Sequence, residues 1–212
     1  MQFEDELQQV LPADLPHRDD LIVKAAGHLA LIVETNQQFN LTRITTPREA
    51  AIKHVLDSVL PWRLFEKAGL VLDAGTGPGF PGLPLAIVLP EVRWVLAEST
   101  QKKAAFVEAT ARQLGLANVE VLPVRAEDLL KKASMDLITA RAVAPLSKAA
   151  ALFGAAIRQG ARALLYKGPD AELEIAEAAQ EARKRRLLMK VVERYELPES
   201  QGARSIVEIT KA

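Results

Sequence analysis

The stretch Leu70-Val-Leu-Asp73-Ala-Gly75-Thr-Gly77-Pro-Gly79-Phe-Pro-Gly82 is the most informative segment of this 212-residue chain. It begins with a short apolar run that ends in a carboxylate, which is typical of a strand buried on both faces of a parallel sheet. The glycines and prolines that follow indicate a tight loop, and the apolar run 83–89 predicts a helix behind it. A strand, a glycine-rich loop and a helix in this order are typical of an open α/β sheet, whose ligand crevice lies at the carboxyl ends of its strands.

Strands and helices alternate along the chain after this loop. Further strands are predicted at 93–97, 119–124, 135–140 and 161–166, and helices are predicted between the first two of these, between the last two and at 170–186. The helix after the second strand is expected to be capped by Ser99 or Thr100 and to stop at Gly115. The segments 187–195 and 205–210 are expected to form a closing hairpin. The sequence therefore predicts an α/β fold with a seven-stranded, mostly parallel sheet and an antiparallel edge.

The first 65 or so residues have a different pattern and predict a helical cap. Apolar residues at helical spacing indicate an amphipathic helix over 19–38. A second helix begins at Thr46, which can cap it, while Pro47 suits its first turn and Glu49 completes a capping box. We therefore expect residues 1–66 to form the N-terminal cap and residues 67–212 to form the α/β domain, together as one compact unit.

Composition excludes several classes of protein and of site. Hydrophobic residues make up 49% of the chain and aromatic residues 5%, so the core is expected to be aliphatic. The chain has no cysteine, which excludes disulfides, thiolate nucleophiles and zinc–cysteine sites. Its three histidines lack a metal-binding spacing, and we expect no metal. The acidic N-terminus is not a signal peptide, and the longest charge-free run, 74–90, is broken by four Gly and four Pro. We therefore expect a cytoplasmic protein without a membrane span.

Charge is balanced overall but unevenly placed. The chain has 27 Lys and Arg and 27 Asp and Glu, which argues against coating nucleic acid by net charge alone. Residues 1–68 contain 7 basic and 10 acidic residues, a net charge of −3, whereas residues 101–190 contain 16 basic and 10 acidic residues, a net charge of +6. A basic face on the second half can meet phosphates, and an ordinary solvated surface is the alternative.

The glycine loop is compatible with two cofactors. The spacing Gly77-x-Gly79-x-x-Gly82, followed 19 residues after Gly79 by Glu98, matches the dinucleotide fingerprint. The prolines in the loop, however, remove backbone donors that a pyrophosphate needs. S-adenosylmethionine has a sulfonium and no phosphate, so the loop favours it, with NAD as the alternative. Asp73 would then shape the loop or hold the methionine ammonium, and Glu98 would bind the ribose hydroxyls. We expect a loop, Gly77 included, that is packed too closely for a side chain.

Polar residues also follow the later strands. Ala126 and Glu127 come after the third strand, where a backbone amide and a carboxylate can pair with an adenine edge. The alternative for Glu127 is an acid that meets a helix dipole. Arg141 follows the fourth strand and can pair with a carboxylate or a phosphate, or form a structural ion pair with Asp73 or Glu98. Lys167 ends the fifth strand and has the same two interpretations.

Six motifs in this order resemble one known family. They are Phe39-Asn40-Leu41-Thr42, His54-Val-Leu-Asp57-Ser58, the glycine loop 73–82, Arg125-Ala-Glu127, Arg141-Ala142 and Lys167-Gly168. The chain resembles the bacterial small-subunit ribosomal RNA methyltransferase G family, also called glucose-inhibited division protein B. The resemblance implies a Rossmann-like class I methyltransferase that uses S-adenosylmethionine to methylate guanine N7 in the decoding-region loop of 16S ribosomal RNA. It also implies 16S ribosomal RNA or a small-subunit precursor as the partner, and we expect a monomer.

The resemblance also implies site residues. Together with the loop argument, it predicts that the cofactor contacts are Asp73, Gly75, Gly77, Gly79, Phe80, Glu98, Ser99, Thr100, Ala126, Glu127 and Arg141. Guanine N7 has no proton, so no general base is expected, and Arg141 is expected to position the reactants, with Lys167 and His54 as further catalytic candidates. His54 and Asp57 can face the site, or they can form a buried pair that ties the cap to the sheet, which we favour. The rival functions are a methyltransferase with another RNA, protein or small-molecule substrate, an NAD oxidoreductase and a non-catalytic RNA-binding protein.

Overall fold

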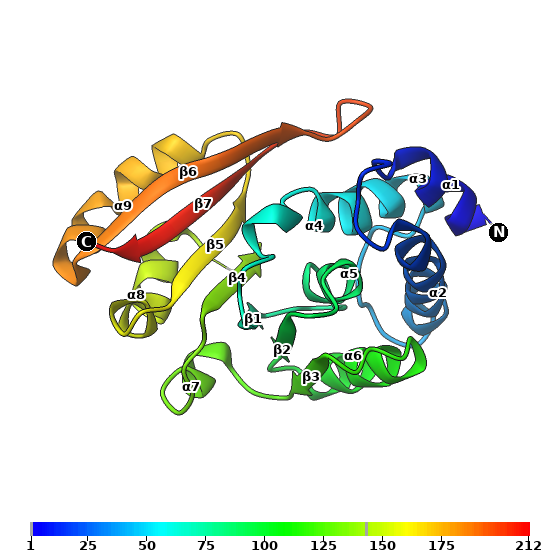
Figure 1. The fold of residues 1–212 in the computed structure, drawn as a ribbon, viewed down its shortest axis with the longest axis horizontal. Helices are drawn as coiled ribbons and strands as arrows, with labels where there is room; N and C mark the ends of the chain where they lie inside the picture. The colour runs from blue at the N-terminus through cyan, green and yellow to red at the C-terminus, as the bar shows by residue number, and fades with distance from the viewer. Residues whose placement is uncertain (1, 143) are drawn as a thin grey trace.

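The computed structural model describes residues 2–142 and 144–212. Its first part is helical, and its remainder alternates strands with helices (Figure 1). The elements are α1 (Gln2–Val10), α2 (Arg18–Asn36), α3 (Pro47–Ala50), the π-helical segment η1 (Ala51–Leu56), α4 (Asp57–Val59), η2 (Trp62–Leu64), β1 (Leu70–Ala74), α5 (Gly82–Val88), β2 (Arg93–Ala97), α6 (Gln101–Gln113), β3 (Val119–Leu122), α7 (Ala126–Leu129), β4 (Leu137–Arg141), α8 (Leu146–Arg158), β5 (Arg162–Lys167), α9 (Ala171–Arg185), β6 (Leu187–Glu196) and β7 (Ala203–Lys211).

Within the described residues, seven strands form one sheet in the order β3-β2-β1-β4-β5-β7-β6. The strands β1 to β5 are parallel, and β7 runs antiparallel to both β5 and β6. The predicted mostly parallel sheet with an antiparallel edge is therefore confirmed. The strand order reverses between β1 and β4, and this reversal point is where ligands bind in open α/β sheets. The glycine loop leaves the sheet there.

Two apolar layers sandwich the sheet because neighbouring strand residues face opposite sides. Val71 packs in the layer that holds α2, α5 and α6, whereas Leu72 packs in the layer that holds α8 and α9. The first layer continues into α1, η1 and α4, so the N-terminal helices and the sheet share one core. The predicted helical cap is thus present, while the domain boundary at residue 66 stays a prediction. None of the helices built from the described residues is long and apolar enough to cross a bilayer.

One N-terminal helix was missed, and two expected side-chain caps are not formed. The helix α1 was not predicted, although its Leu7 is completely buried. The capping box is not formed, because the Thr46 side chain makes no cap bond and Glu49 instead pairs with Lys53 at 2.7 Å. Thr100 is the N-cap of α6 but also makes no side-chain cap bond.

Candidate functional site

The glycine loop joins β1 to α5 with a backbone that few other residues adopt. Gly75, Gly77 and Gly79 have φ values of 72°, 60° and 105°, a region that L side chains avoid. A Cβ on Gly79 would lie 2.6 Å from Leu83 Cδ1, so this part of the loop is crowded as expected. At Gly77, however, a Cβ would meet nothing within 4 Å. The crowding prediction is wrong at Gly77, where the loop borders open space.

Asp73, at the end of β1, holds the loop in shape. Its Oδ2 accepts a hydrogen bond from the Thr76 hydroxyl at 2.7 Å and one from the Gly82 N–H at 2.9 Å. The side chain is completely buried, and this burial raises the pKa of Asp73 to about 6. Its Oδ1 is buried without a hydrogen-bond partner among the described atoms, so it is an acceptor that a donor group beside the loop would satisfy. Of its two predicted roles, the geometry supports shaping the loop.

Glu98 follows β2 and ties the loop to the next helix. Its Oε2 accepts the Gly77 N–H at 3.1 Å, and its Oε1 accepts the Thr100 N–H at 2.7 Å. This second bond satisfies the N–H of Thr100, the N-cap residue of α6. Each carboxylate oxygen has a further lone pair that can accept a hydroxyl hydrogen. The structure therefore places Glu98 beside the loop, as the dinucleotide-like spacing predicts.

A cavity of about 220 Å³ lies at the carboxyl ends of β1, β2 and β3. It brings together four of the predicted cofactor contacts, Gly75, Ser99, Ala126 and Glu127. Its other walls are apolar side chains from the strand ends and α8 together with two cations, and they are Ala74, Ala97, Val124, Leu152, Phe153, Arg125 and Lys148. Apolar walls that carry a few polar and charged groups are typical of a small-molecule site. The predicted roles of these residues can therefore be met in one place.

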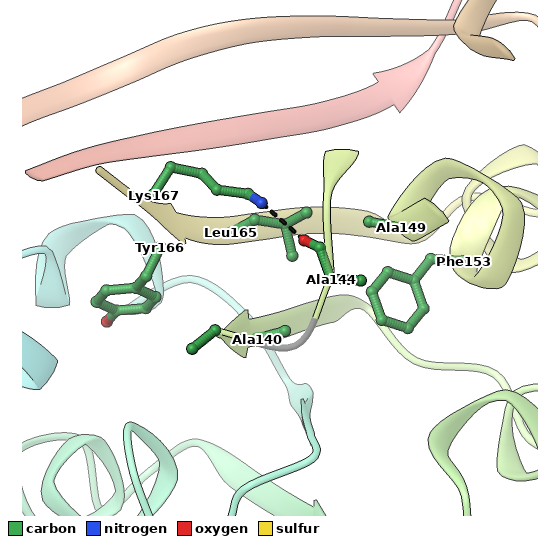
Figure 2. Close-up of a pocket in the computed structure, with 8 residues that line it drawn as sticks. Ala140, Ala144, Ala149, Phe153, Leu165, Tyr166 and Lys167 are labelled. Atoms are coloured by element: carbon green, nitrogen blue, oxygen red, sulfur yellow. Dashed lines mark hydrogen bonds between the residues drawn. The ribbon is translucent and has the colours of Figure 1, made fainter. Parts of the chain in front are cut away.

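A second cavity, of about 440 Å³, lies where the cap meets β4, β5 and β7. A small cavity, whose lining Figure 2 shows, shares Phe153 with the first cavity and Tyr166 and Lys167 with the second, so it lies between them. The three cavities thus form a row along the carboxyl edge of the sheet. The second cavity has a charged lining that includes Lys53, His54, Asp57, Arg141, Lys167 and Arg204.

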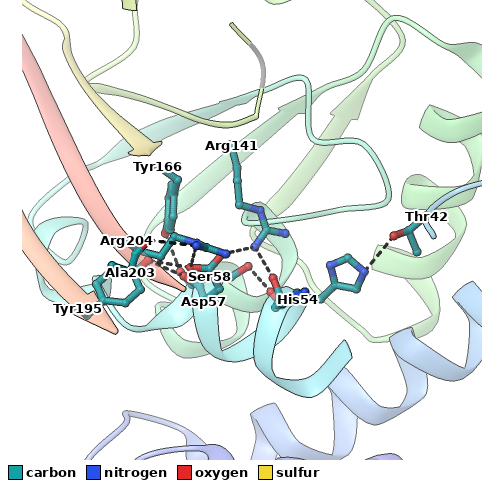
Figure 3. Close-up of polar contacts among 10 residues, drawn as sticks. Thr42, His54, Asp57, Ser58, Arg141, Tyr166, Tyr195, Ala203 and Arg204 are labelled. Atoms are coloured by element: carbon teal, nitrogen blue, oxygen red, sulfur yellow. Dashed lines mark hydrogen bonds and ion pairs between the residues drawn. The ribbon is translucent and has the colours of Figure 1, made fainter. Parts of the chain in front are cut away.

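Asp57 is the centre of the charged lining (Figure 3). It is only 2% exposed and pairs with Arg141 Nη1 at 3.3 Å and with Arg204 Nε at 3.4 Å. The Tyr195 hydroxyl donates to its Oδ1 at 3.0 Å. Of the interpretations of Arg141, an ion pair with a carboxylate is observed, but its partner is Asp57 of the cap and not Asp73 or Glu98, the partners named for the structural alternative. The Lys53 carbonyl, in the π-helical segment η1, accepts a further bond from Arg141 at 2.9 Å.

His54 has different neighbours from those expected. It does not pair with Asp57. Its Nε2 lies 3.2 Å from Thr42 Oγ1, and its ring stacks on Phe80 at a centroid distance of 4.6 Å. Burial, reinforced by the positive charge of Arg141, lowers the pKa of His54 to about 3. His54 is therefore a neutral residue that joins the cap to the glycine loop.

Phe80 is the part of the loop that enters the cap. The ring of His28, on α2, also stacks on it at 4.6 Å, and the Arg141 guanidinium lies 5.5 Å from its centroid. His28 is buried, which lowers its pKa to about 4, and its Nε2 lies 2.7 Å from the Pro78 carbonyl oxygen. His28 and His54 of the cap therefore hold the glycine loop in place through their contacts with Phe80 and Pro78.

Lys167 is engaged in an ion pair. Its Nζ lies 2.8 Å from Glu174 Oε1 and donates to the Ala144 carbonyl oxygen at 2.7 Å, the contact drawn in Figure 2. Of the two interpretations of Lys167, the structural ion pair is the one observed.

Sequence reasoning missed Arg204 and Tyr195. Arg204 enters the site because β7 lies antiparallel beside β5, with Ser205 opposite Lys167. Its place in the site can be predicted only from the pairing of β7 with β5, and the hairpin pattern in the sequence does not show which strand of the hairpin pairs with β5. Among residues 2–142 and 144–212, no group of three or more His, Asp or Glu side chains is placed to hold a metal.

Comparisons with known proteins agree with this geometry. A family model described as rRNA small subunit methyltransferase G matches residues 22–206. A protein named ribosomal RNA small subunit methyltransferase G, from Solibacter usitatus (strain Ellin6076), is 69% identical over 209 residues, which cover 99% of this chain and all of the relative.

Solved structures share the fold at low sequence identity. The structure titled cofactor-bound Rv0187 from MTB is 21% identical with a TM-score of 0.60, and the match covers 87% of this chain and 89% of that one. The O-methyltransferase TomG from Streptomyces achromogenes, in complex with SAM, is 16% identical with a TM-score of 0.56 and the same coverage. These likenesses confirm the predicted Rossmann-like, class I methyltransferase fold.

Proposed function

Because the chain belongs to the ribosomal RNA small subunit methyltransferase G family, we propose that it transfers a methyl group from S-adenosylmethionine to N7 of a guanine in 16S ribosomal RNA. The observation that carries this proposal is the row of cavities along the carboxyl edge of the sheet. One end of the row lies beside the glycine loop and combines small side chains with Ser99 and Glu127, and the other end contains the guanidinium groups of Arg141 and Arg204. A cofactor and a charged nucleic acid substrate can thus meet within one site.

The first cavity is the proposed cofactor site. Gly75 and Gly77 would let the cofactor approach the backbone, Glu98, Ser99 and Thr100 would face the ribose, and Ala126 and Glu127 would pair with the adenine. Asp73, Gly79 and Phe80 would keep the loop in shape. The buried, unpartnered Oδ1 of Asp73 supports the fit, because it is an acceptor near the place where a methionine ammonium would lie.

The second cavity is the proposed substrate site. Arg141 and Arg204 present their guanidinium groups there while Asp57 fixes both. Guanidinium groups bind phosphates and guanine O6 with well-defined geometry. We propose that Arg141, which also contacts the ring of Phe80 in the loop, positions the target base against the cofactor.

The reaction requires little acid–base chemistry from the chain. Bound S-adenosylmethionine supplies a methyl group made electrophilic by its sulfonium. Guanine N7 has a lone pair and no proton, so the chain needs no general base. This is compatible with His54, whose lowered pKa of about 3 makes it a weak base, and with the ion-paired Lys167. The task of the residues is alignment, which can contribute on the order of 7–11 kcal/mol when reactants are well oriented.

The partner and the assembly state are also part of the proposal. The substrate would be 16S ribosomal RNA or a small-subunit precursor, which would place the reaction in the cytoplasm. All residues of the proposed site come from one chain, so a monomer is sufficient, and no proposed step needs a metal.

The test is tritiated methyl transfer from S-adenosylmethionine to small subunits from cells that lack the enzyme, followed by mapping of the modified base. We expect label at N7 of one guanine in 16S ribosomal RNA. Label in another RNA, or in protein only, would contradict the substrate assignment. Calorimetry should show binding of S-adenosylhomocysteine and none of NAD.

A further inference from the structure

Seven exposed basic side chains gather at one end of the molecule. They come from α8, β5, α9, β6 and β7 and are Arg158, Arg162, Arg183, Lys184, Arg186, Lys190 and Lys211. Figure 1 shows the end of α9, the start of β6 and the end of β7 together beside the C-terminus. We call these seven residues the distal basic patch.

The strand register brings these residues together. Lys211 lies opposite the first residue of β6, which directly follows Arg186. Glu208 of β7 binds both Arg162 and Lys190, each at 3.1 Å. Arg162, Lys190 and Glu208 lie on the face of the sheet opposite the one that α8 and α9 cover, so the patch wraps around this end of the sheet and combines residues that are distant in sequence.

This surface has more cations than it has partners for them. In the part of the chain that the structure describes, Arg158, Arg183, Lys184, Arg186 and Lys211 make no ion pair, while Arg162 and Lys190 share a single carboxylate. The dipoles of α8 and α9 favour cations in their last turns. They do not account for Lys211, which lies on a strand, or for Arg186, which lies beyond the last turn of α9. Like charges held together repel unless an anion neutralises them.

We propose that the distal basic patch binds a second segment of the RNA substrate through its phosphates. This inference rests on the proposed function. Arg162 and Lys167 are the two ends of β5, so the patch lies roughly 17 Å from the proposed substrate site at about 3.3 Å per residue. Unpaired Lys and Arg side chains bind phosphates without reading sequence and release counterions when they do so. The patch would hold the substrate in register while the base enters the site.

The test replaces three patch cations and compares them with three matched ones. The patch variant is Arg183→Gln/Lys184→Gln/Lys211→Gln, and the control variant is Lys67→Gln/Arg93→Gln/Lys132→Gln, which removes the same charge from other exposed positions. We expect KM for the small-subunit substrate to rise on the order of tenfold in the patch variant, with kcat unchanged. The slope of log affinity against log salt should become shallower by about 2, at ~0.7 per phosphate.

A second measurement separates this inference from the proposed function. RNA binding is measured by filter retention of 16S ribosomal RNA without cofactor, so it does not depend on methyl transfer. Wild-type protein that binds the RNA but methylates none of it would contradict the proposed function alone. A patch variant with the affinity and salt slope of the control would overturn the patch. Loss of binding to phosphatidylserine vesicles with unchanged RNA affinity would also overturn it, and would assign the surface to lipid.

Discussion

The two ends of the proposed site are built in different ways. The cofactor end combines the backbone of the glycine loop, residues 73–82, with residues that directly follow β2 and β3. The substrate end is made by side chains from α4, β4, β6 and β7 that converge on one carboxylate, Asp57. The cofactor end depends on the backbone conformations and the space that glycine provides. The substrate end depends on the pairing of buried charges. Their variants should therefore fail in different ways.

The largest expected effect is at Gly77. Gly77→Val should abolish binding of S-adenosylhomocysteine, because the side chain would occupy the open space beside the loop and strain a φ of 60°. Gly115→Val is the matched control, with a φ of 68°, open space around it and a position remote from the loop. Calorimetry should find normal affinity in the control. Equal losses in both variants would show that strain, and not the occupied space, is responsible.

Asp57→Ala should break the substrate end through stability. It would leave Arg141 and Arg204 near each other without their carboxylate, and breaking a buried pair in this way costs about 3–5 kcal/mol. Chemical denaturation would measure this loss. Asp57→Asn keeps the shape, so its methyl transfer can be assayed on folded protein. An unchanged free energy of unfolding in Asp57→Ala would refute the central role of this carboxylate.

Arg141→Ala should separate turnover from folding. We expect methyl transfer to slow by about 100-fold, because small misplacements of well-aligned reactants have effects of this size. Lys102→Ala/Lys103→Ala, in the helix after β2, should slow it much less. Single-turnover rates of both variants provide the measurement, and near-normal turnover in Arg141→Ala would remove Arg141 from the site.

Glu98→Gln should weaken the cofactor end moderately. The amide has only one oxygen, so it can accept from either the Gly77 or the Thr100 N–H but not from both. A lost charge-assisted bond is worth about 1.5–3 kcal/mol, so affinity for S-adenosylhomocysteine should fall about tenfold or more. A change below twofold would place the ribose elsewhere.

The smallest effect concerns acid stability. Burial lowers the pKa of His28 to about 4, so the unfolded chain binds more protons than the folded one between that value and pH 6.5. Stability from this group is complete above pH 6.5 and is lost as the pH falls toward 4. Between pH 7 and 5.5 the loss should be about 1 kcal/mol, and His28→Gln should lose less. Burial acts oppositely on Asp73, whose raised pKa lowers stability as the pH rises from 4 to 6. Denaturation curves at several pH values would show the difference.

The sequence predicts the cofactor end better than the substrate end for a physical reason. The glycine loop, Asp73 and Glu98 act on neighbours near in sequence or at strand ends, so spacing alone brings them together. Asp57 and Arg204 meet only because β7 inserts between β5 and β6, which no local pattern encodes. The wrong partners assigned to Arg141 and His54 have the same origin. The capping box failed because Lys53 competed for Glu49.

The contact between Asp57 and Arg204 spans 147 residues, and this separation has a consequence for biosynthesis. Translation delivers the cap, the glycine loop and β4 long before it delivers β7. A chain interrupted before β7 would already contain the glycine loop. Its Asp57 would lack the guanidinium group of Arg204, which β7 supplies. The substrate end can therefore be complete only after β7 has been synthesised.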